Sequence, residues 1–118
     1  MKLFLLISAI IEIIAGLALF LIPGKAAKLG TDQPAGLTFS NMYGAAALAV
    51  GFLGLQAWQN TDNIGFIQAF LLSFIIFHIG VMMATYKGTT RGMKEMLPAV
   101  ILHAVLAVAS IYFFMQVR

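Results

Sequence analysis

The sequence predicts an all-α membrane protein, an antiparallel bundle of four transmembrane helices that forms a single domain over residues 1–118. The composition is the first reason, because 62% of the residues are hydrophobic, 9% are charged and the mean hydropathy is +1.00. Soluble domains carry roughly a quarter charged residues. The second reason is the segregation of the charges into short stretches between long apolar runs, as insertion into a bilayer requires.

Four apolar runs define the expected spans, at residues 3–22, 39–58, 64–86 and 97–115. About 20 residues are needed for a helix to cross the ~30 Å hydrocarbon core. Only helices and closed barrels satisfy their backbones in lipid, and barrel strands are about ten residues long and alternate in polarity. The first run ends at Pro23-Gly24, and it is too long for a signal peptide, so we expect it to be retained.

The distribution of Lys and Arg predicts the orientation. Four spans put both ends of the sequence on one side, which carries Lys2 and Arg118. The other side carries five basic residues, Lys25, Lys28, Lys87, Arg91 and Lys94. By the positive-inside rule both termini lie outside, and loops 23–38 and 87–96 lie in the cytoplasm. The net charge of +3 is therefore read as attraction to lipid headgroups, and we expect no nucleic-acid partner.

Three ionisable residues interrupt the apolar runs. Glu12 lies in the middle of the first run, where a carboxylate costs roughly 2.5–3.5 kcal/mol on insertion scales. At 1.5 Å per residue, Glu12, His78 and His103 lie about 15, 12 and 9 Å from the cytoplasmic side. Asn41 and Tyr43 enter the second run from that side. We predict that these five residues form a polar layer that binds a ligand or relays protons.

Small residues at helical spacing mark faces that pack against other helices. Small side chains let neighbouring backbones approach closely in a membrane. The first run contributes Ser8 and Gly16, which flank Glu12 at intervals of four and turn it inward. The second run contributes a stripe of five residues, Ser40, Gly44, Ala47, Gly51 and Gly54. The polar layer has a structural reading too, since hydrogen bonds between membrane helices contribute about 0.6 kcal/mol on average.

Several chemistries find no support in the sequence. The chain has no cysteines, which excludes disulfides and thiol chemistry. It has no phosphate loop, no HExxH motif and no nucleophile elbow, so we assign no catalytic residue. Neighbouring helices 8–10 Å apart leave no room for a bis-histidine haem. Methionines 82, 83, 93 and 96 are read as apolar filler and not as copper ligands, so we assign no metal site, and the cofactor stays unknown.

Parts of the chain resemble two known families of membrane proteins. Glu12-Ile13-Ile14-Ala15-Gly16, the glycine-rich second run and a fourth run that opens at Pro98 resemble the small bacterial DoxX-like four-span proteins. The resemblance covers most of the chain and implies this topology in a bacterial inner membrane. A few members of that family are tied to quinone-linked redox complexes. The stretch from Ala9 to Glu12 also resembles the small multidrug resistance exporters, whose Pro, Tyr and Trp signature is absent here.

Three functions follow as expectations. The first is binding or proton-linked transport of a small amphipathic ligand, with Glu12 as the protonatable counter-charge and His78 and His103 as relay partners. The second is a quinone-linked oxidoreductase subunit that uses the same residues, so the question of enzymatic activity stays open. The third is a structural subunit in which the polar layer holds helices together. Four short helices enclose little interior, so we expect a homo-oligomer or a subunit of a membrane complex.

Overall fold

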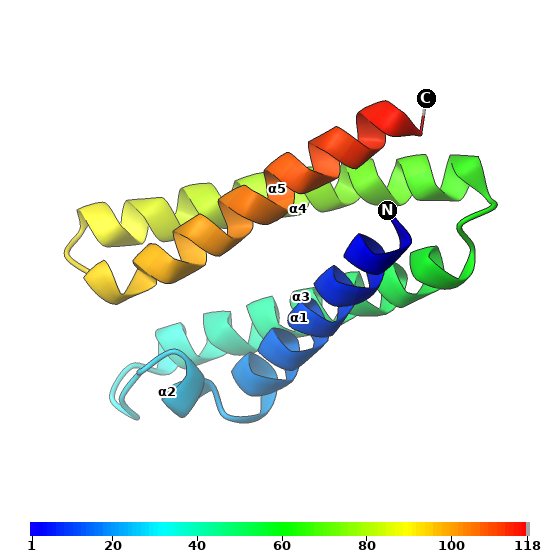
Figure 1. The fold of residues 1–118 in the computed structure, drawn as a ribbon. Coiled ribbons are helices and arrows are strands. Elements are labelled where there is room, and N and C mark those ends of the chain that lie inside the picture. The colour runs from blue at the N-terminus through cyan, green and yellow to red at the C-terminus, as the bar shows by residue number, and fades with distance from the viewer. Residues whose placement is uncertain (118) are drawn as a thin grey trace. The chain divides into compact units, whose positions relative to one another are not determined.

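A computed structural model describes residues 1–117 and confirms the all-α fold class. Four long helices account for most of the chain (Figure 1). They are α1 (Lys2–Leu21), α3 (Pro34–Gln59), α4 (Ile64–Thr90) and α5 (Leu97–Gln116). Two short elements lie in the connections, the single helical turn α2 (Pro23–Ala26) and the 3-10 turn η1 (Lys94–Met96). No strand occurs among the described residues.

All four long helices have the length and composition needed to cross a membrane. Their outer surfaces are apolar, and Leu3, Phe39 and Val108 are each more than two-thirds exposed. A soluble monomer rarely exposes apolar surface so extensively, whereas lipid solvates it at little cost. Two helices are longer than the predicted spans. Helix α3 begins earlier, at Pro34, and helix α4 ends later, at Thr90. Residues 34–38 and 87–90, which the sequence assigned to loops, are therefore helical.

The chain divides into two compact units, residues 1–59 and residues from 60 onward. Each unit is a helical hairpin, with α1 and α3 in the first and α4 and α5 in the second. The single transmembrane domain expected from the sequence stays a prediction.

The N-terminal hairpin is held by direct contact between helix backbones. A Cβ atom built on Gly44 would lie 2.6 Å from the Phe20 nitrogen and 2.9 Å from the Gly16 oxygen. A Cβ atom on Gly51 would lie 3.0 Å from the Ala9 oxygen and 3.0 Å from the Ile13 nitrogen. The later glycine on α3 meets the earlier residues of α1, so the two helices are antiparallel. Only glycine fits at these crossing points, as expected for close packing of membrane helices.

The C-terminal hairpin is antiparallel by the same test. Near its open end, the Gln68 side chain donates to the Val117 carbonyl at 3.1 Å. At the closed end, a Cβ atom on Gly88 would lie 2.6 Å from Sδ of Met96, so the 3-10 turn packs directly on α4. Gly92 supplies the turn with a φ of 100°, which costs glycine little. At the other end, Asn63 caps α4 by accepting from the Phe66 N–H at 3.0 Å.

The glycine contacts predict the effect of single methyl groups. Gly44→Ala should lower the free energy of unfolding by about 1–3 kcal/mol, because the new Cβ meets rigid backbone. Gly80→Ala is the matched control, since a Cβ there has no neighbour within 4 Å and alanine favours the helix by up to about 1 kcal/mol. Reversible unfolding in mixed micelles measures both values. Equal stability of the two variants would contradict the backbone contact.

Candidate functional site

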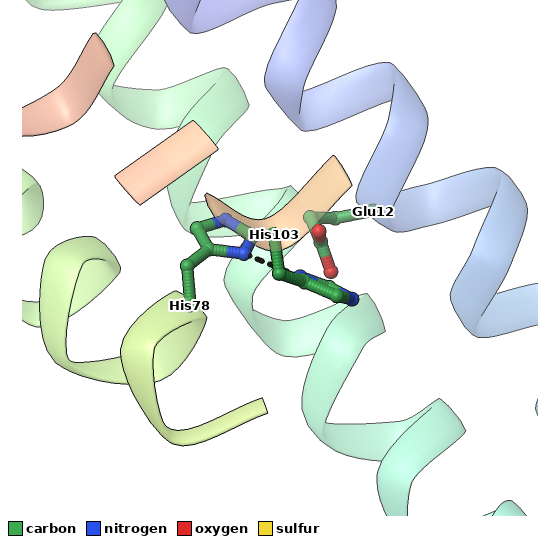
Figure 2. A group of neighbouring side chains, drawn as sticks. All are labelled: Glu12, His78 and His103. Carbon is green, nitrogen blue, oxygen red and sulfur yellow. Dashed lines mark hydrogen bonds between the residues drawn. The ribbon is translucent and has the colours of Figure 1, made fainter. Parts of the chain in front are cut away.

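Two histidines meet inside the C-terminal hairpin. Figure 2 shows His78 on α4 and His103 on α5 joined through their Nδ1 atoms, which are 2.7 Å apart. The ring centroids are 5.0 Å apart and the ring planes are tilted by 32°. His78 is fully buried and His103 is 6% exposed. The hairpin thus brings together two residues separated by 25 positions, both predicted for the polar layer.

The Nδ1–Nδ1 contact restricts where the protons of the pair reside. A hydrogen bond needs one donor and one acceptor, so one Nδ1 carries a proton and the other presents a lone pair. When both rings are neutral, the accepting ring carries its own proton on Nε2, and the Nε2 of the donating ring is unprotonated. The neutral pair therefore offers one N–H donor and one lone pair on its two Nε2 atoms. It can take up one further proton without losing the bond between the rings.

Aromatic side chains on α4 line the His78 ring. The Phe74 and His78 rings form a T-shaped pair with a centroid separation of 4.0 Å and an interplanar angle of 85°. The Phe77 and His78 rings form a second such pair at 5.2 Å and 74°. Phe70 stacks on Phe74 with a centroid separation of 5.2 Å, so residues 70, 74 and 78 follow one face of the helix. These rings keep water away, and hydrogen bonds are stronger in such low-dielectric surroundings.

Glu12 is buried on α1 of the N-terminal hairpin, with 1% of its surface exposed. It projects from the helix between Ser8 and Gly16, one turn away on each side, and Figure 2 shows its carboxylate. The Ser8 hydroxyl donates to the Phe4 carbonyl of its own helix at 2.8 Å. Tyr43 on α3 lies within electrostatic range of the Glu12 carboxylate. The hairpin therefore combines a buried acid with a phenol, and both belong to the predicted layer.

Asn41, the remaining residue of the predicted layer, lies on α3 and contacts the last turn of α1. In the orientation that satisfies its amide, the nitrogen donates to the Leu19 and Phe20 carbonyls, each at 3.2 Å. Carbonyls in the last turn of a helix lack partners within the helix, and Asn41 supplies one from α3. Leu19 follows Glu12 by seven residues, about 10 Å along the helix axis. Asn41 therefore caps α1 and stabilises the hairpin about two turns away from the acid.

The small residues named from the sequence are buried in the first hairpin. On α1 these are Ser8 and Gly16, and on α3 they are Ser40, Gly44, Ala47, Gly51 and Gly54. The predicted layer did not include Phe74 and Phe77, which enclose His78. The signal for Phe74 is present in the sequence, because a residue four positions before a helical histidine lies on the same face of the helix. The contact of Phe77 with the neighbouring His78 ring is seen only in the structure. Buried Ser110 was likewise not assigned, and its hydroxyl donates to the Leu106 carbonyl at 2.6 Å.

Comparison of the chain with protein-family models, with curated proteins and with solved structures found no match. The resemblance to DoxX-like proteins stays a prediction, and the function of these residues is inferred from their own geometry.

The histidine pair predicts non-additive effects of substitution. His78→Leu or His103→Leu alone should lower the free energy of unfolding by about 1–3 kcal/mol, because the remaining imidazole loses its buried partner. The double variant should be no less stable than either single variant, since neither buried polar ring remains. A double-mutant cycle from unfolding in micelles measures the coupling. Additive losses would show that the two rings do not depend on each other.

Proposed function

We propose that the protein binds a small amphipathic molecule inside the membrane at its buried ionisable residues, and that binding is linked to proton movement. The observation that carries the proposal is the His78–His103 pair, which shares one proton in an apolar setting. A ligand with a polar head and an apolar body matches a polar pair that lies between two helices with apolar outer surfaces.

The pair can transfer a proton by reversing its own hydrogen bond. A proton arriving on the bare Nε2 of the donating ring makes that ring doubly protonated. Its Nδ1 proton then crosses the 2.7 Å gap to the other ring, whose Nε2 proton leaves. One proton enters and one departs, and the donor and acceptor at Nε2 have exchanged places. Histidine suits this role because its neutral ring has one donor nitrogen and one acceptor nitrogen, which exchange places when the tautomer changes.

Glu12 provides the counter-charge in this proposal, and Tyr43 lies within electrostatic range of it. An ionisable residue within a membrane span is by default a functional one because of its cost. Its assignment to the same ligand as the histidines rests on depth counting along the sequence, which places all three at similar depths. A carboxylate that exchanges a proton for a cationic or hydrogen-bonding ligand would couple transport to the proton gradient.

Quinone binding is a second candidate, favoured by the donor and acceptor that the pair offers together. The N–H of one ring suits a quinone carbonyl, and the lone pair of the other suits a quinol hydroxyl. Quinone extracted with the purified protein, identified by the loss of its ultraviolet band on reduction, would favour this candidate over transport.

Native mass spectrometry tests the proposed ligand. The wild type should retain a small molecule that Glu12→Gln loses, because the amide cannot exchange a proton. Glu95→Gln is the matched control, since Glu95 is an exposed acid in η1. Equal retention by all three proteins would remove Glu12 from the site. An absence of ligand in each, with oligomer mass unchanged, would favour a structural role for the polar residues.

The proposed orientation has its own test, because the chain contains no cysteine and any introduced thiol is unique. The introduced thiol of Asp62→Cys should react with a membrane-impermeant maleimide on intact cells. Cysteine at Lys28 or Thr89 should react only after permeabilisation. The reverse pattern would place both termini in the cytoplasm and overturn the orientation expected from the basic residues.

A further inference from the structure

We propose that the His78–His103 pair is a binding site for a divalent first-row transition-metal ion of the zinc class. This goes beyond the proposed ligand, because the metal would take the position of the proton shared by the two Nδ1 atoms. Neutral imidazole is a common ligand for such ions and binds them through either nitrogen.

The geometry of the pair is close to that of two ligands in a tetrahedral shell. Zn–N distances of about 2.0–2.1 Å at a tetrahedral angle put two nitrogens roughly 3.3 Å apart. The two Nδ1 atoms are 2.7 Å apart and directed at each other. A separation larger by about 0.6 Å, within reach of small side-chain rotations, would accommodate the ion between them.

Binding of the metal ion to the neutral pair releases no proton, so no other group has to accept one. In the neutral pair each imidazole carries one proton. When the ion takes both Nδ1 lone pairs, the ring that donated moves its proton from Nδ1 to Nε2, and no proton is released. Both Nε2 atoms then carry a proton, which fixes both rings in the tautomer that binds a metal through Nδ1. A pair holding an extra proton must release it first, so affinity should fall as pH falls.

Two histidines occupy half of a four-coordinate shell. Closed structural zinc sites use four protein ligands, whereas open sites leave positions for water or substrate. With two nitrogens from one hairpin, the site belongs to the open kind. The ion would be held by the protein and still exchange ligands, as transport or Lewis-acid chemistry requires.

Packing of the two helices does not require a pair of histidines. Ser8 and Ser110 are also buried in long helices, and their hydroxyls bond to carbonyls of their own helices. Hydroxyl and amide side chains also provide hydrogen bonds between membrane helices, without a second basic nitrogen on each ring. The Nδ1–Nδ1 pairing is therefore better explained by a ligand that uses both lone pairs.

Cobalt titration tests the metal site, because Co²⁺ in a zinc site has visible absorption bands. The full chain is purified in detergent without a histidine tag and stripped with a chelator. We expect one Co²⁺ per chain, displaced by Zn²⁺, and affinity weakened at least tenfold in His78→Gln and in His103→Gln. These are the two histidines of the chain, so each variant lacks half the site. Glu95→Gln, which removes an exposed carboxylate, should bind as the wild type does.

Unchanged affinity in both histidine variants, or no binding by the wild type, would overturn the proposal. Circular dichroism and elution volume establish that the variants are folded. If they are not, ¹⁵N-histidine NMR of the wild type decides, since Zn²⁺ should shift both Nδ1 signals and leave the Nε2 atoms protonated. Unshifted Nδ1 signals would reject the site. Metal binding without any retained small molecule would leave this inference standing while the proposed ligand fails.

Discussion

The constraint on which the whole structure depends is the satisfaction of backbone hydrogen bonds where water is absent. A chain this apolar meets it with helices, whose N–H and C=O groups pair within the same segment. The N–H and C=O groups at helix ends have no partner within the helix, and polar side chains form hydrogen bonds with some of them here. Asn63 accepts from the first turn of α4, and Asn41 donates to the last turn of α1. Few polar residues are then left for other roles, which makes the buried histidines and Glu12 informative.

The two hairpins solve the packing problem in different ways. In the first, glycines allow α1 and α3 to touch through their backbones, so the contact is made by dispersion and close approach. In the second, α4 contributes bulky side chains such as Phe70, Leu71 and Phe74, and α5 contributes Leu106. An imidazole pair crosses that interface. At the glycine crossing points of the first hairpin the backbones are in contact, which leaves no space there for two rings.

The shared proton connects the two proposals for the C-terminal hairpin. One hydrogen bond between two Nδ1 atoms leaves a donor and an acceptor on the Nε2 atoms, which suits a hydrogen-bonding ligand. The same two Nδ1 lone pairs, freed of that proton, suit a metal ion. Proton transfer through the pair changes the tautomer of both rings, whereas metal binding changes only that of the ring that donated. The aromatic enclosure by Phe74 and Phe77 favours both roles by excluding water that would otherwise compete for the nitrogens.

The sequence by itself determined the all-α class, the four long helices and the inward position of Glu12 and of the small residues in the first two runs. Length and hydropathy suffice for the helices, because the bilayer permits few alternatives, and the 3.6-residue period suffices for the faces of Ser8, Gly16 and Gly44. The tertiary structure decided which atoms meet. The Nδ1–Nδ1 contact, the enclosure of His78 by Phe74 and Phe77, and the turn of Asn41 toward α1 depend on helix rotation and side-chain rotamers. Both are set by packing against a neighbouring helix, and spacing along one chain segment does not encode that packing.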